Sequence, residues 1–166
     1  MADPQDPTLP AELPVLPVRS TVVFPLSVHP LVVTAPAAIN SVNRALAGDR
    51  LVALLFQHDG KEEVQPDSLS RIGTAGIVRQ MARGPNGIQV LVEGLARIRA
   101  DRIDADGQAV TAAITPLPER VEPSLEVDAH VRRIRELVDR AFSLASGLPP
   151  ELRTILAGID DPLRLC

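Results

Sequence analysis

The chain has 166 residues, of which 45% are hydrophobic and only 2% aromatic, and its formal net charge is −4. This apolar content supports a buried aliphatic core and excludes a fully disordered chain. An acidic chain without tyrosine or tryptophan also lacks the basic patch and the aromatic platforms that are typical of nucleic-acid binders. We therefore expect no nucleic-acid partner, with an arginine-rich face around Arg97, Arg99 and Arg102 as the alternative.

The two ends of the chain bear on its cellular location. The single cysteine, Cys166, is the last residue, so no disulfide and no cysteine-based metal site can form within the chain. No apolar run reaches the roughly 18 residues that a membrane helix needs. Residues 1–12 are acidic and proline-rich, without the basic start and apolar stretch of a signal peptide. We expect a disordered leader over residues 1–12, a cytoplasmic location and no membrane partner.

The stretch from residue 13 to residue 56 begins with irregular strands and continues with a helix. Prolines interrupt the β-branched residues of 13–33, as in edge strands, because proline cannot donate a hydrogen bond to a neighbouring strand. Pro36 and Gly48 are the favoured start and end residues of a helix between them. The apolar run 51–56 predicts a strand that is buried on both faces.

The stretch from residue 57 to residue 118 predicts a polar loop and then more strands. A hairpin turn over 84–87 joins a strand over 72–82 to one over 88–92, which continues over 95–103 after a bend at Gly94, and a last strand covers 109–117. We expect an α+β fold in which residues 13–118 form a small, bent, partly closed β-barrel of about six strands with one helix. Such closure hides strand edges that would otherwise promote aggregation.

A helical subdomain is expected over residues 119–166, after a proline-rich linker over 116–123. Ser124 can cap a helix that runs to about Ser146, and further short helices are expected to begin at Pro149-Pro150 and at Asp161-Pro162. Apolar residues of the long helix are spaced alternately by four and three, as in a heptad seam: Val127, Val131, Ile134, Val138, Ala141, Ala145 and Leu148. A second stripe lies beside them: His130, Leu137 and Leu144.

None of the polar residues forms a pattern that predicts catalysis. Lys61 lies in a polar loop that lacks the glycine and the serine or threonine of a phosphate-binding loop. The three histidines, His29, His58 and His130, are far apart and do not have the spacing of metal ligands. Asp161, beside a proline, suits a helix start better than an acid pair. We expect no catalytic residue, no cofactor and no metal.

Apolar residues at positions that the pattern leaves open to solvent are the stronger functional signal. One group is an apolar stretch broken by proline, and the other shares a strand face with charged residues. Contiguous exposed apolar surface marks interaction sites. The candidate protein-binding residues are therefore Val23, Phe24, Pro25, Leu26, Leu91 and Leu95. The alternative is that the stretch 22–26 closes one end of the barrel.

Several stretches together resemble the N-terminal domain of the Lon family of ATP-dependent proteases. In the family's order and spacing, they are LPVLPVRSTVVFP (13–25), AGDRLVALLFQ (47–57), IGTAGIVRQ (72–80), PNGIQVLVEGLARIR (85–99), GLPPEL (147–152) and IDDPLRL (159–165). Ser20 departs from the pattern, because the family usually has an aspartate after the arginine, and this difference bears on the cap of a local turn.

This resemblance implies a PUA-like barrel followed by a helical subdomain. It also implies a non-catalytic module that captures unfolded or degron-bearing proteins and helps to assemble the hexamer, so the expected partners are misfolded client proteins and other Lon subunits. The ATPase and Ser-Lys protease domains would lie in a longer chain, of which these residues would be a truncated fragment. The alternatives are a stand-alone Lon-domain protein that binds peptides or acts as an adaptor, and an RNA-binding barrel, since PUA-like folds often bind RNA.

Overall fold

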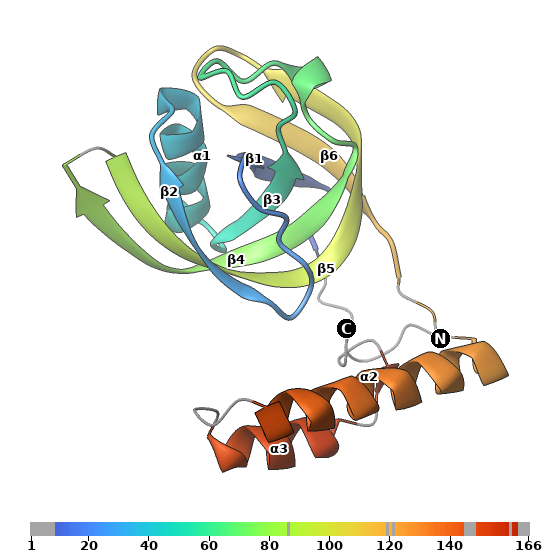
Figure 1. The fold of residues 1–166 in the computed structure, drawn as a ribbon. Helices are drawn as coiled ribbons and strands as arrows, with labels where there is room; N and C mark the ends of the chain where they lie inside the picture. The colour runs from blue at the N-terminus through green and yellow to red at the C-terminus, as the bar shows by residue number, and fades with distance from the viewer. Residues whose placement is uncertain are drawn as a thin grey trace. The chain divides into compact units, whose positions relative to one another are not determined.

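The computed structural model describes residues 9–85, 87–118, 120, 122–144, 149–159 and 161–162. The chain divides into two compact units, residues 1–118 and residues 119–166. The described part is mostly sheet with a few helices (Figure 1). No described helix combines the length and the apolar character needed to cross a membrane.

The first unit contains one six-stranded sheet in the order β2-β5-β4-β3-β1-β6. The strands are β1 (Glu12–Val18), β2 (Val28–Val33), β3 (Leu51–Phe56), β4 (Ile72–Gly84), β5 (Gly87–Ala105) and β6 (Val110–Pro116). Strand β5 pairs with β6 as well as with β4, so the pairings β5 to β4 to β3 to β1 to β6 return to β5. Among the described strands, β2 pairs with β5 alone and is therefore an edge strand.

Strand β5 is long because it pairs with different strands along its length. Its residues 88–93 pair with β2, and its residues 98–105 pair with β6. Register shifts interrupt its pairing with β4 and β6, and such bulges bend and twist a strand. Figure 1 shows β4 and β5 sweeping together around the first unit. This arrangement confirms the predicted hairpin turn, where Gly84 pairs with Gly87, and the continuation of the strand beyond Gly94.

The core consists of two apolar clusters on opposite faces of β1 and β3. The first cluster packs helix α1 (Pro36–Ala47) against the sheet and includes Val42 and Leu54. The second is formed by the strands of the ring, with Leu55 and Ile98 among its members, and by Val64 and Leu69 from the segment between β3 and β4. Because adjacent residues of β3 belong to different clusters, the prediction that strand 51–56 is buried on both faces is confirmed. The helix predicted between Pro36 and Gly48 is confirmed too.

The expected leader, residues 1–12, lies mostly outside the described residues. The last part of this segment is described and is structured: Leu9 packs against the second cluster, and Glu12 begins β1. Glu12 pairs with Ala113 of β6, so the sheet begins before the boundary expected at residue 13.

The second unit contains helices α2 (Leu125–Leu144) and α3 (Pro150–Ala157), which contact each other. Ser124 caps α2 as predicted, since its hydroxyl oxygen accepts the Val127 N–H over 3.2 Å. Four positions of the predicted heptad seam are half-buried, namely Val127, Val131, Ile134 and Val138, whereas Ala141 is exposed. The residues of the second stripe, His130, Leu137 and Leu144, are exposed. Ala145, Leu148 and most of the helix expected after Asp161 lie outside the described residues.

Candidate functional site

Residues Phe24 to Ser27 form a tight turn ahead of β2. The Ser27 N–H donates to the Phe24 carbonyl over 3.3 Å, and the Ser27 hydroxyl donates to the same oxygen over 2.6 Å. Pro25 and Leu26 occupy the central positions, and the φ angle of Leu26 is 64°. A type II turn needs this left-handed conformation at its third residue, where glycine is usual. A leucine there is strained, and strain of this kind collects at functional sites.

The turn is fixed to the sheet by buried polar contacts. The Leu26 N–H donates to the Gly94 carbonyl and the Gly94 N–H donates to the Ser27 carbonyl, both over 2.9 Å. The buried Thr74 hydroxyl donates to the Val23 carbonyl over 2.6 Å. The backbone on both sides of the turn is therefore held in place by β4 and β5.

This anchoring separates neighbouring side chains into core and surface. Val23 is only 4% exposed and belongs to the first core cluster, so its assignment to the candidate protein-binding surface is corrected. Phe24 and Leu26 are 58% and 59% exposed, although both are large and apolar. Pro25 is half-buried. The stretch 22–26 thus contributes one side chain, Val23, to the core and presents three others, Val22, Phe24 and Leu26, to solvent.

A second group of exposed apolar side chains lies on the outer face of β2. Val28 and Val32 are 54% and 69% exposed, and Pro30 between them is exposed too. Leu91 of β5 pairs with Pro30, and directly paired residues of antiparallel strands share a face of the sheet. We call Phe24, Leu26, Val28, Pro30, Val32 and Leu91 the β2 patch.

The sequence-based candidates overlap with the β2 patch only in part. Phe24, Leu26 and Leu91 belong to it, whereas Leu95 is half-buried where the register between β4 and β5 shifts. Val28, Pro30 and Val32 were missed, because the prolines of this segment hid its strand pattern. Their alternation with the half-buried or buried residues His29, Leu31 and Val33 is a period of two that could have revealed them.

An ion pair borders the β2 patch. Glu93 of β5 pairs with Val28, and its carboxylate lies 2.6 Å from Arg79 Nε. The patch is therefore bordered by a closed ion pair, and its own side chains carry no charge. An arrangement of this kind suits contact with apolar segments of another chain.

The described residues do not assemble a catalytic or metal centre. His58 Nε2 lies 2.9 Å from the Ser70 hydroxyl, and the His58 ring packs edge-on against Phe56. No described contact joins His58 to a carboxylate that could orient it as a general base. The Asp59 carboxylate instead accepts a hydrogen bond from Gln57, which lowers the pKa of Asp59. Nowhere in the described ranges do three histidine, cysteine, aspartate or glutamate side chains gather as metal ligands.

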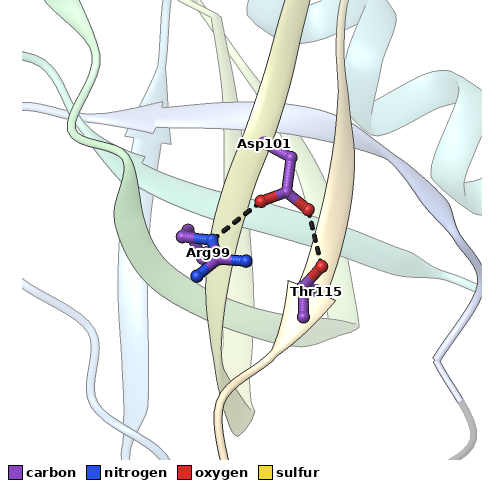
Figure 2. A network of polar contacts seen from close by, with 3 residues as sticks. All are labelled: Arg99, Asp101 and Thr115. Carbon is purple, nitrogen blue, oxygen red and sulfur yellow. Dashed lines mark hydrogen bonds and ion pairs between the residues drawn. The ribbon is translucent and has the colours of Figure 1, made fainter.

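The arginine-rich face considered as an alternative nucleic-acid site also contains carboxylates that pair with its arginines. Arg99 Nε lies 2.7 Å from the Asp101 carboxylate, which also accepts a hydrogen bond from the Thr115 hydroxyl. Figure 2 shows both contacts meeting at Asp101. The Thr115 hydroxyl, with Arg99 second, lowers the pKa of Asp101. Arg102 is paired in the same way with Asp104, over 2.6 Å. This strand therefore lacks the excess positive charge that binding to a phosphate backbone requires.

Comparison with known proteins adds sequence relationships to this geometry. Residues 12–166 match the family model described as the ATP-dependent protease La (LON) substrate-binding domain. The chain is 36% identical over 157 residues to a Lon protease of Trichlorobacter lovleyi, covering 93% of the chain and 19% of that protein. It is 34% identical over 162 residues to a Lon protease of Dictyoglomus thermophilum, covering 97% of the chain and 20% of that protein. The chain thus spans about a fifth of the length of these relatives.

Solved structures share the fold. The N-terminal domain of Mycobacterium avium complex Lon protease superposes with a TM-score of 0.71 at 20% identity, over 93% of this chain and 78% of that one. A Lon N-terminal domain protein from Xanthomonas campestris superposes with a TM-score of 0.55 at 19% identity, over 93% of this chain and 94% of that one.

Proposed function

Because this chain belongs to the family of Lon protease substrate-binding domains, we propose that it is a recognition module that binds unfolded or degron-bearing proteins through the β2 patch. The 166 residues correspond to this domain and do not include the ATPase and protease domains of a Lon protease. Its role is then to hold a client, while chemistry takes place elsewhere.

The exposed turn at Phe24 and Leu26 is the observation that carries this proposal. Two large apolar side chains are held in solvent by a backbone that Gly94 and Thr74 fix to the sheet. A rigid apolar surface loses little conformational entropy on binding, so more of the free energy of desolvation remains as affinity. Unfolded proteins expose the aliphatic and aromatic segments that such a surface can bury.

Contacts of this size are weak one at a time, and several copies acting together would raise the avidity. We propose that the domain acts in an assembly with other Lon subunits, in the cytoplasm. The exposed stripe of α2, Leu137 and Leu144, supports a role of the second unit in such contacts.

We also propose the finer description of the fold as a bent, partly closed PUA-like barrel over residues 13–118, with a helical subdomain over 119–166. The ring of strand pairings through β5 and β6 supports the barrel. The division of the chain into two compact units supports the boundary.

A binding comparison between two forms of one client tests the proposed function. A fluorescently labelled protein is used in its native form and in a reduced, carboxymethylated form that cannot refold, and anisotropy is followed as the 166-residue chain is added. We expect saturable binding of the unfolded form only. Equal binding of both forms, or of neither, contradicts the proposal.

Two alternatives predict different results. A stand-alone peptide-binding or adaptor protein of the Lon-domain kind would be encoded by a reading frame without the ATPase and protease domains, which sequencing of the gene decides. An RNA-binding barrel would show RNA affinity that falls steeply with salt. The neutralised pairs of Arg99 and Arg102 argue against it.

A further inference from the structure

A groove of about 460 Å³ lies along β2. One wall is formed by residues 29–35, the other by Pro17–Thr21, and Ala38 of α1 also lines it. No residue of β5, the strand that pairs with β2, lines this groove. The groove therefore lies on the side of β2 that faces away from its described partner.

The lining shows that the groove follows the backbone of β2 rather than one of its faces. Successive side chains of a strand point to opposite faces of the sheet. All five residues from His29 to Val33 line the groove, although Pro30 and Val32 face outward whereas Leu31 and Val33 pack against the core. Residues from both faces can meet one cavity at the edge of the strand, where backbone N–H and C=O groups point.

The opposite wall is also a strand edge. Residues 12–14 of β1 pair with β6 on one side, and residues 15–18 pair with β3. Beyond Pro14, one edge of β1 therefore has no partner among the described strands. Pro17 and Val18, at the end of β1, line the groove.

The chemistry of the lining restricts what fits. Val18, Val33, Ala35 and Ala38 are buried apolar side chains that form its deeper surface. The ionisable residues of the lining are Arg19 and His29, and a carboxylate is not among them. Arg19 is held in place by Gln57 Oε1 at 3.0 Å and by the Glu62 carbonyl at 3.3 Å. An aliphatic chain that is neutral or acidic complements this surface.

We propose that the groove binds an extended aliphatic segment of a client protein, neutral or acidic in charge, as an added strand on the free edge of β2. This inference rests on the proposed function and states how the client is held. Strand addition uses main-chain hydrogen bonds for affinity and side-chain pockets for preference. It selects unfolded clients, because a folded protein has already paired its backbone groups.

The two prolines in the walls limit this mode of binding. Pro30 of β2 and Pro17 of β1 lack an N–H, so each shortens the ladder that an added strand can form. Prolines on edge strands also block uncontrolled pairing between copies of a protein. The groove would therefore hold a short segment and release it readily.

The decisive experiment removes backbone donors from a peptide without changing its side chains. An eight-residue, uncharged peptide of alternating valine and threonine is titrated against the 166-residue chain, in three forms: unmodified, N-methylated at the even amides and N-methylated at the odd amides. We expect at least one methylated set to bind about tenfold more weakly or worse, because it loses several hydrogen bonds. Equal affinity of all three forms overturns strand addition. If the unfolded client still binds in that case, the proposed function stands; if neither client nor peptide binds, both fail.

Hydrogen exchange locates the bound peptide. On binding, those amides of residues 28–33 that point to the free edge of β2 should exchange more slowly, Pro30 having no amide proton, while residues 111–113 of β6, which already pair with both β1 and β5, should not change. Protection confined to other segments overturns the proposal.

A charge reversal provides matched variants. Ser20 is exposed and lines the groove, whereas Gln108 is exposed and does not. With an acidic version of the peptide, Ser20→Glu should weaken binding several-fold, Ser20→Arg should not, and Gln108→Glu should have no effect. Equal effects of Ser20→Glu and Gln108→Glu contradict the location.

Discussion

The carbonyl oxygen of Phe24 lies against the α-carbon of Gly94, so close that a side chain at position 94 would collide with it. This contact is made where β5 has ended its pairing with β2 and has not yet begun its pairing with β6. The missing side chain of Gly94 thus lets the exposed turn approach β5 closely and form hydrogen bonds with the N–H and the carbonyl of Gly94.

Replacing Gly94 by alanine should displace the turn. The added methyl group has to push away a backbone oxygen, and we expect a loss of about 2 kcal/mol in the free energy of unfolding, together with weaker client binding. Chemical denaturation measures the first and anisotropy the second. Gly84→Ala is the matched control, since its nearest neighbour would lie at an ordinary 3.6 Å. Equal stabilities of the two variants would show that the close contact does not constrain the turn.

Replacing Leu26 by asparagine should separate stability from binding. Asparagine tolerates the left-handed conformation better than leucine, so the variant should be as stable as the parent or more stable, by up to about 1 kcal/mol. Because an exposed leucine is lost from the β2 patch, client affinity should fall. Arg50 has a φ angle of 66° and lies outside the patch, so Arg50→Asn should change stability alone. The prediction fails if both variants bind clients like the parent.

Substitutions at the neighbouring residues Phe24 and Val23 should affect different properties: the first client affinity, the second stability. Phe24→Ser removes an exposed ring and should weaken client binding by about tenfold, with a change in stability within about 0.5 kcal/mol. Val23→Ala opens a cavity in the core and should cost about 1–3 kcal/mol of stability, with the affinity of the folded protein unchanged. Chemical denaturation measures the stability of both variants, and anisotropy measures their affinity for the client. If Phe24→Ser binds the client with full affinity, Phe24 does not belong to the binding site.

The pKa of Asp101 should rise when its hydrogen bond from Thr115 is removed. In the folded protein this bond, and the ion pair with Arg99 second, lower the pKa. A lowered folded-state pKa stabilises the protein above the ordinary pKa of the carboxyl group, and this stabilisation is lost as the pH falls through the lowered value. The stability advantage of the parent over Thr115→Val should therefore be largest near neutral pH and disappear in acid.

Carbon-detected NMR titration of the aspartate carboxyl groups measures the shift directly. Thr111→Val is the control, because no described hydrogen bond joins the Thr111 hydroxyl to a carboxylate. An unchanged pKa of Asp101 in Thr115→Val would contradict the assignment of the cause.

Local signals in the sequence were sufficient for much of the fold. Proline and glycine at its ends predicted α1, an unbroken apolar run predicted β3, and a turn motif predicted the hairpin between β4 and β5. Each of these elements depends on residues within a few positions of each other. The exchange of partners along β5 could not be predicted in this way, because it depends on strands that are distant in the sequence.

The candidate site was predicted less completely for the same reason. In the stretch 22–26 no periodicity tells which side chain is buried. Thr74 and Gly94 decide this, by fixing the backbone so that Val23 enters the core and Phe24 leaves it. On β2, by contrast, Val28, Pro30 and Val32 do follow a period of two, which the prolines obscured.

Crosslinking of an unfolded client, followed by mapping of the labelled residues, tests the central claim most directly. A carboxymethylated client that carries a photoreactive group is bound to the 166-residue chain, irradiated and digested, and the attachment sites are identified by mass spectrometry. If the β2 patch and the groove beside it hold the client, the labels will concentrate on residues 17–35 and near Leu91. Labels that spread evenly over the surface, or that gather on β6 and α1, would contradict the claim.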